Sequence, residues 1–162
     1  MKKVTVIIGR ICSGKSNYAQ KHYNDDKHLI IEVGQLVRDI KQQQQRVFDD
    51  SLHNELSKQI CQTLNEYYYQ NDVVIVGIRQ QEILQSVLQW CQKNLIQLVV
   101  KYLDVPYSTR HNRYLKRKDF KDSGQKFSDL DLKEVMLGVE QLIDYLDTLH
   151  IYYNVDVQKI TN

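Results

Sequence analysis

The sequence predicts an α/β fold with a mainly parallel five-stranded sheet and helices on both of its faces. Two patterns carry this prediction. Short β-branched, apolar runs alternate along the chain with segments in which apolar residues recur every three to four positions, as expected when parallel strands are joined by helices. A glycine-containing turn also separates the first apolar run from the first helical segment, which is typical of folds that bind phosphate groups at that turn.

Length and composition narrow the possible classes of protein. A chain of 162 residues without an internal repeat or linker fits one domain, which we expect to span residues 1–162. The 22 Lys and Arg residues nearly balance the 20 Asp and Glu residues, so a net charge of +2 argues against a membrane surface or nucleic acid as the partner. No stretch reaches the roughly 20 apolar residues of a membrane span. Three widely spaced cysteines without a C-x-x-C pair favour a reduced, cytoplasmic setting over a disulfide framework or a zinc site.

Five segments have the β-branched, apolar composition of buried strands. Turn-forming or helix-starting residues follow four of them, namely Gly9, Gly34, Gly77 and Pro106. The predicted strands are residues 4–8, 28–33, 73–76, 98–103 and 150–154.

The segments between these strands have helical periodicity. Leu52, Leu56, Ile60 and Leu64, for example, form one apolar stripe along a helix. Residues 128–131 resemble a capping box, which would start another helix. We expect helices near residues 13–23, 35–48, 49–68, 83–91, 106–117 and 128–146.

The turn after the first strand fits the phosphate-loop pattern G-x-x-x-x-G-K-[ST], with Gly9, Gly14, Lys15 and Ser16 at the constrained positions. Glycine lets backbone N–H groups surround a phosphate without interference from a Cβ atom. Lys15 can reach the β- and γ-phosphates of a nucleotide, and the Ser16 hydroxyl can ligate Mg²⁺. The helix that begins near Ser13 adds its positive N-terminal end. The turn therefore predicts a site for ATP and its magnesium ion.

A second cationic element lies far along the chain. Arg110, Arg113 and Arg117 are spaced so that all three fall on one face of a helix. Segment 110–121 contains six Lys and Arg residues but only one acid, and forked arginine donors stabilise the charge that spreads over a transferring phosphoryl group. We expect Arg110 to bind the nucleotide and Arg113 and Arg117 to take part in catalysis. A solvated basic face and a weak RNA-binding patch are the alternatives.

Two further arginines follow predicted strands. Arg38 lies one helical turn after Gly34, and Arg79 lies two residues after Gly77. Because ligands of parallel sheets bind beyond the carboxyl ends of the strands, both side chains are expected to face one crevice. A surface salt bridge would explain either arginine alone. Together they predict a site for a second anion, with the two glycines at its edge.

The phosphate loop, the segments 33–38 and 76–79, and the arginine-rich helix together resemble the nucleoside monophosphate kinases, a family of P-loop kinases that includes adenylate kinase. In that family the helix after the second strand often carries G-D-x-x-R, and the third strand often ends in D-G-x-x-R or D-G-x-R. The resemblance covers most of the chain. It implies an enzyme that uses ATP and Mg²⁺ to phosphorylate a nucleoside or deoxynucleoside monophosphate.

The same resemblance implies roles for particular residues. Arg38 and Arg79 would bind the acceptor monophosphate, with residues 34–70 as the acceptor-binding helical region. The polar segment 118–127 would form a short lid that closes over the transferring group. A loop after Asn154 would contact the donor base.

The sequence departs from the family pattern at two acids. Gln35 replaces the acid of the first motif, and Val76 replaces the acid that normally helps to hold the magnesium shell. Glu32 is our candidate for the missing carboxylate, because related kinases such as dephospho-coenzyme A kinase and shikimate kinase carry an Asp at about that place. Asp104 is the second choice. The alternative for Glu32 is an exposed acid at a strand end.

These observations leave three hypotheses about function. The first is transfer to a monophosphate, the second is transfer to a hydroxyl-bearing metabolite with Glu32 as the base, and the third is a nucleotide-binding regulator with little turnover. The missing acids favour the regulator, whereas two arginines at a second anion site favour an enzyme. The sequence does not distinguish a monomer from a homodimer.

Overall fold

A single parallel sheet organises the chain. The computed structural model describes residues 2–44, 50–117 and 124–161. The strand order is β2-β3-β1-β4-β5, and every neighbouring pair is parallel. The strands are β1 (Lys3–Ile8), β2 (His28–Glu32), β3 (Asp72–Val76), β4 (Gln97–Asp104) and β5 (Asp156–Thr161). The prediction of a five-stranded parallel sheet in an α/β fold is confirmed.

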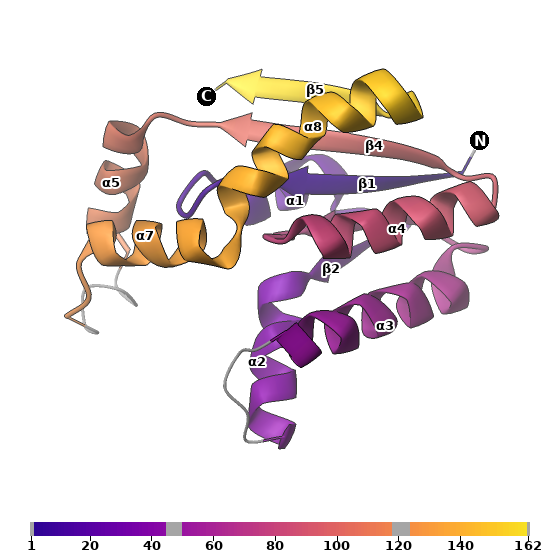
Figure 1. Cartoon of the computed structure of the whole chain (residues 1–162), viewed down its shortest axis with the longest axis horizontal. Helices are drawn as coiled ribbons and strands as arrows, with labels where there is room; N and C mark the ends of the chain where they lie inside the picture. Colours follow the sequence, from indigo (N-terminus) through magenta and orange to yellow (C-terminus); the bar gives the residue numbers. More distant parts are fainter. Residues whose placement is uncertain (1, 45–49, 118–123, 162) are drawn as a thin grey trace.

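Helices cover both faces of this sheet (Figure 1). Helix α1 packs on one face, and α3, α4 and α8 lie on the other. Helices α5 and α7 stand beyond the ends to which the strand arrows point, beside the loop that follows β1. The helices are α1 (Lys15–Tyr23), α2 (Val33–Gln44), α3 (Asp50–Tyr67), α4 (Gln81–Lys93), α5 (Tyr107–Leu115), α7 (Phe127–Leu137) and α8 (Val139–Tyr153). None of the helices in the described ranges has the length and apolar character to cross a membrane.

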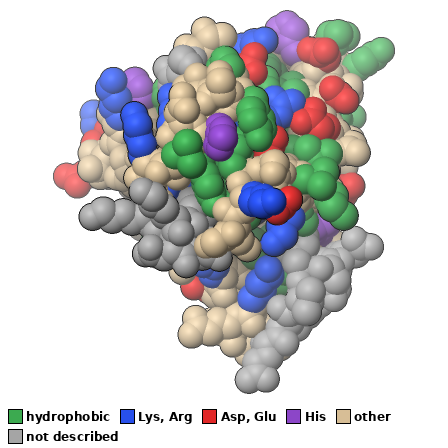
Figure 2. Space-filling model, turned by 90° about the vertical axis from the view of Figure 1, so that its left-hand side faces the viewer, with side chains coloured by type: hydrophobic (Ala, Val, Ile, Leu, Met, Phe, Trp, Pro, Cys, Tyr) green, Lys and Arg blue, Asp and Glu red, His purple; other side chains and the backbone are tan. Residues whose placement is uncertain are grey.

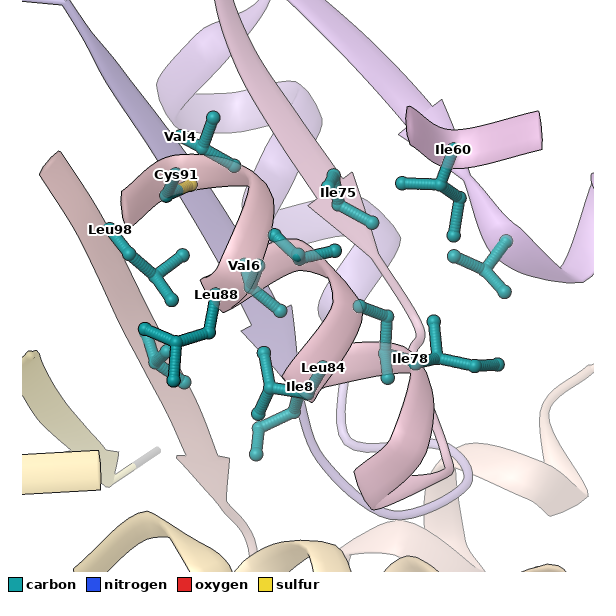
Figure 3. Close-up of a cluster of buried hydrophobic side chains, with 14 of the residues drawn as sticks. Val4, Val6, Ile8, Ile60, Ile75, Ile78, Leu84, Leu88, Cys91 and Leu98 are labelled. Carbon is teal, nitrogen blue, oxygen red and sulfur yellow. The ribbon is translucent and has the colours of Figure 1, made fainter. Parts of the chain in front are cut away.

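The alternation of side chains along the strands divides the core into two parts. In β1, Val4, Val6 and Ile8 point to the side of α4, whereas Ile7 points to the side of α1. Figure 3 shows the first set packed against Leu84, Leu88 and other residues of α4. Because β1 is buried on both faces from Val4 to Ile8, its residues there are mostly β-branched and apolar and do not alternate with charged ones.

The last predicted strand is wrong. Residues 150–153 form the end of α8, and the strand begins only at Asp156. The apolar stripe of α8 continues through Leu149, so helical packing outweighs the local β propensity of the following tyrosines. Asn154 ends the helix with a φ of 53°, a left-handed conformation that asparagine tolerates better than most residues.

The helix predicted at residues 128–146 is in fact two helices. Gly138, with a φ of 105°, separates α7 from α8. The capping box is also wrong, because α7 has no side-chain cap and Asp131 instead binds Arg110. At the other end of the chain, α2 already begins at Val33, which places Gly34 inside a helix.

Part of the predicted lid lies outside the described residues. Of the segment 118–127, residues 118–123 are not described, and residues 124–126 lead directly into α7. The last residues of the helix predicted at 35–48 are also outside the described ranges, which resume at residue 50.

Leu84→Ala tests the packing of α4 on the sheet. Leu84 is fully buried, so we expect the free energy of unfolding to fall by about 2–5 kcal/mol, from lost apolar burial and the cavity left behind. Urea unfolding followed by circular dichroism measures the change. Ile151→Ala is the control, because this side chain is 69% exposed and its removal should change stability by about 0.5 kcal/mol or less. Equal losses in the two variants would contradict this packing.

Candidate functional site

The phosphate loop joins β1 to α1 at the carboxyl edge of the sheet, the end that faces the viewer in Figure 2. Its glycines are required by geometry. A Cβ atom on Gly9 would lie 2.9 Å from the carbonyl oxygen of Leu103 and 2.6 Å from Oγ of Ser13, which leaves no room for a side chain. Gly14 has a φ of 89°, so the chain can turn into α1 without strain. These positions allow the loop backbone to surround a phosphate.

The side chain of Lys15 lies across the phosphate loop and contacts its backbone. Its Nζ donates hydrogen bonds to the carbonyl oxygens of Gly9, at 2.8 Å, and Arg10, at 2.9 Å. Burial lowers the pKa of Lys15 to about 8, and the negative charge of Glu134 partly opposes this effect. The lysine is therefore a partly buried cation that a bound phosphate would stabilise in its charged form.

Ser16 and Glu32 form an oxygen-rich pair at the start of α1. The Ser16 hydroxyl lies 3.2 Å from Oε2 of Glu32, which ends β2. Hydroxyl and carboxylate oxygens suit Mg²⁺, which commonly takes one or two protein ligands and completes its shell with water and phosphate. The donor set therefore fits a magnesium ion bound together with a nucleotide, although the described residues hold no larger cluster of metal-ligating side chains.

The position of the missing family acid has a structural role. Val76 is 1% exposed and packs with Ile7, Ala19 and Leu103 in the core under α1. Asp104, the second choice for the carboxylate, instead pairs with Lys159 at 2.9 Å, and this hydrogen bond holds its pKa below the ordinary value. Of the two acids, only Glu32 contacts Ser16 among the described contacts.

The arginines of α5 and the residues after it divide into two groups. Arg113 donates to the carbonyl oxygen of Ser13 at 2.9 Å, and Arg117 lies 3.8 Å from Sγ of Cys12, so both meet the phosphate loop. Arg110 is 3% exposed and is bonded to Val105, Ile11 and Asp131. It is an anchor of α5 and α7, and the structure does not bring it into the crevice.

A pocket of about 540 Å³ opens beside the loop and joins most of the predicted site residues. Four cationic side chains and two carboxylates line it. The charged residues that line it are Lys15, Arg38, Arg79, Arg117, Glu32 and Glu134. Two smaller pockets adjoin the same residues.

The first neighbouring pocket, of about 460 Å³, shares Gly34, Gly77 and Arg79 with the main one. Its walls are largely apolar, with lysines among its lining residues. The other residues that line it include Val33, Val37, Met136, Leu137, Lys41 and Lys133. A third pocket, of about 280 Å³, lies beside the phosphate loop, between α1 and Arg113.

The two predicted acceptor arginines have different partners. Nη2 of Arg38 donates to Oε1 of Gln35 at 2.8 Å, so the residue that replaces the family acid is a neutral partner of this guanidinium. Gln35 in turn donates to Asp39 at 2.8 Å, which fixes its orientation. Nε of Arg79 lies 2.9 Å from Oε1 of Glu134, so this arginine is ion-paired.

Sequence reasoning missed Glu134, which reaches the site from α7. The sequence did contain a signal. Glu134 lies four residues after Leu130 and three before Leu137, which places an acid on the apolar face of its helix. An acid at a buried position usually has a partner, and here the partner is Arg79.

Asn154 does not join the site. It precedes β5, whose first residue pairs with Val99 near the start of β4, so it lies toward the amino edge of the sheet. The phosphate loop is at the opposite edge, where Ile8 pairs with Tyr102. The predicted contact between the donor base and a loop after Asn154 depended on the misplaced last strand.

The sequence matches no family model and no curated protein. Its structure is similar to those of solved kinases. A gluconokinase from Sinorhizobium meliloti 1021 aligns with a TM-score of 0.64 and 14% identity over 98% of this chain and 82% of the other. A sugar kinase from Janibacter sp. HTCC2649 aligns with a TM-score of 0.61 and 12% identity over 99% and 86%.

A chain of the Pnkp1/Rnl/Hen1 RNA repair complex aligns with a TM-score of 0.63 and 17% identity over 91% of this chain. The present chain spans 46% of the length of that protein. At these identities the similarity concerns the fold, which this chain shares with the gluconokinase and the sugar kinase. It does not single out the nucleoside monophosphate kinases.

The lowered pKa of Lys15 predicts how nucleotide affinity depends on pH. The ammonium is charged below about pH 8 and loses its proton above it, so Mg-ATP affinity should be constant below pH 7. Above pH 8 it should fall by up to about tenfold per pH unit. Isothermal titration calorimetry between pH 6 and 9.5 measures the affinity for Mg-ATP. Lys15→Ala should bind more weakly and show no inflection near pH 8, and an inflection that persists in this variant would assign it to another group.

Proposed function

We propose that this chain is an ATP-dependent kinase that transfers the γ-phosphoryl group to a nucleoside or deoxynucleoside monophosphate. The observation that carries the proposal is the single pocket that contains the phosphate-loop lysine, Lys15, together with Arg38 and Arg79. A donor phosphate on Lys15 and an acceptor anion on the two arginines would therefore meet within one space. Such positioning, with charge stabilisation, is most of what phosphoryl transfer requires.

On the donor side, the loop backbone and Lys15 would hold the β- and γ-phosphates. Ser16 and Glu32 would hold Mg²⁺, which neutralises negative charge on the phosphate oxygens when it is bound. Arg113 already contacts the loop through Ser13, and the third pocket beside it has room for part of a nucleoside. Arg117 would add positive charge near the transferring group.

On the acceptor side, Arg38 and Arg79 would hold the monophosphate with Gly34 and Gly77 at its edge. The largely apolar neighbouring pocket suits the nucleoside part of the acceptor, because nucleobases bury well against aliphatic side chains. It shares Arg79 and both glycines with the main pocket, so a molecule could occupy both at once. Residues 34–70 would thus act as the acceptor-binding region of a single kinase domain spanning residues 1–162.

The chemistry of the attacking group also favours a monophosphate acceptor. The attacking oxygen of a phosphate already carries negative charge, so a strong general base is not required. Closure of α5 and α7 over the transferring group would exclude water and prevent hydrolysis of ATP.

A hydroxyl-bearing acceptor with an anionic group is the second candidate. Glu32 favours it, because this carboxylate lies 3.2 Å from Ser16, in the same pocket as Lys15, where a general base for a hydroxyl would be needed. Two of the similar structures are a gluconokinase and a sugar kinase, whose names refer to hydroxyl-bearing substrates.

Product formation from Mg-ATP with ribo- and deoxynucleoside monophosphates tests the proposal, with gluconate, shikimate and dephospho-coenzyme A as hydroxyl acceptors. We expect diphosphate from one or two monophosphates and none with Lys15→Ala. Arg79→Gln should raise the KM of the acceptor by about 10–100-fold, the equivalent of about one charged hydrogen bond, without changing ATP affinity. Lys93→Gln, an exposed change outside the pockets, is the matched control.

Turnover of a hydroxyl acceptor alone would instead favour the second candidate. Tight ATP binding without transfer to any acceptor would favour the nucleotide-binding regulator. Normal acceptor kinetics in Arg79→Gln would remove this arginine from the acceptor site.

A further inference from the structure

Glu134 is a buried acid in the wall of the main pocket. It is 3% exposed, and its Oε1 lies 2.9 Å from Nε of Arg79. Its negative charge also acts on Lys15 across the same pocket. A buried carboxylate is destabilising unless a nearby cation compensates for its charge. Arg79 and Lys15 are the two cations that compensate for Glu134.

The contact between Glu134 and Arg79 involves one edge of the guanidinium. Nε of Arg79 and both carboxylate oxygens of Glu134 are buried and make no hydrogen bond among the described residues, so the two groups meet as an ion pair, while 40% of the Arg79 side chain is exposed. A guanidinium is planar and presents its donors in a fixed fork. The ion pair holds the Nε side of the guanidinium against Glu134 and leaves the exposed part of the side chain for another anion. Arg79 lines both the main pocket and its apolar neighbour, where the acceptor is proposed to bind.

A second acid connects the same helix to the phosphate loop. Asp131 lies three residues before Glu134, and its Oδ1 accepts a hydrogen bond from Nη1 of Arg110 at 2.7 Å. The same Nη1 donates to the carbonyl oxygen of Ile11, in the phosphate loop, at 3.3 Å. Positions three apart share one face of a helix. One face of α7 thus contacts two parts of the site. Asp131 connects it to the phosphate loop through Arg110, and Glu134 contacts Arg79.

We propose that Glu134 is a positioning residue of the acceptor site. It holds the guanidinium of Arg79 in the orientation that accepts an anion, and it does so from a helix that Asp131 and Arg110 connect to the phosphate loop. This inference rests on the proposed kinase function. A competing role for Glu134 is to occupy Arg79 as an internal anion that the acceptor must displace, and the two roles predict opposite changes in acceptor affinity.

The test compares Glu134→Gln with Asp129→Asn, which removes an exposed acid from the first turn of the same helix. At saturating ATP, Glu134→Gln should raise the KM of the acceptor by about tenfold while ATP affinity changes less than twofold. Asp129→Asn should leave both unchanged. A lower acceptor KM in Glu134→Gln would overturn the proposal in favour of the internal anion.

A double-mutant cycle separates positioning from a general structural effect. If Glu134 acts through Arg79, Glu134→Gln should cause no further rise in acceptor KM when Arg79→Gln is already present. An undiminished tenfold rise in that background would overturn the proposal. Thermal unfolding checks that each variant is folded, and Glu134→Asp, which keeps the charge, provides a second test if Glu134→Gln is not. Its shorter side chain should raise the acceptor KM in the native background and have no effect beside Arg79→Gln.

Failure of this inference differs from failure of the proposed function. The absence of product with every acceptor would contradict the kinase function. The role of Glu134 can still be measured without turnover, by titrating inorganic phosphate into the protein in the presence of a non-hydrolysable ATP analogue. Phosphate should bind about tenfold more weakly to Glu134→Gln than to the native protein. The double variant Glu134→Gln/Arg79→Gln should bind phosphate as well as Arg79→Gln alone does. Equal phosphate affinity in the native protein and Glu134→Gln would contradict the inference by itself.

Discussion

The parallel pairing of β1, β2 and β3 is the constraint on which the candidate site depends. The register pairs Ile7 with Val76 and Val76 with Glu32, so these three strands end at the same level. The segments that follow them carry the phosphate loop, the start of α2 and Arg79. Backbone hydrogen bonds of the sheet therefore bring residues from distant parts of the sequence to one edge. Helices α5 and α7 cover the remaining side of that edge (Figure 1).

Charge is concentrated at this edge, although the whole chain has a net charge of only +2. Cations from four segments line the main pocket, and the two carboxylates in it compensate them only in part. Glu32 lies at the magnesium-binding side, beside Ser16, whereas Glu134 contacts Arg79. Each acid thus contacts a residue with a proposed role, Ser16 in magnesium binding and Arg79 in acceptor binding. The excess of positive charge suits the binding of two anions at close distance, which is what transfer between two phosphates requires.

Much of this arrangement could be predicted because its determinants are local in the sequence. The phosphate loop is a contiguous pattern, and Arg38 and Arg79 follow strands at short spacing, so the sheet topology alone predicts their shared pocket. The burial of Arg110 could not be predicted, because it depends on an ion pair with Asp131 across 21 positions. The contribution of Glu134 likewise depends on how α7 packs. The last strand was misplaced because helical packing of α8 outweighs the β propensity of its final residues.

The most direct test of the account is the affinity of the native protein for adenosine 5′-pentaphosphate relative to ATP. The two additional phosphates would extend from the phosphate loop toward Arg38 and Arg79, so one molecule would occupy both anion sites. The account predicts at least about tenfold tighter binding of the pentaphosphate than of ATP, with this gain lost in Arg79→Gln and kept in Lys93→Gln. Equal affinities of the native protein for the two nucleotides would contradict the claim that the donor and acceptor anion sites share one pocket.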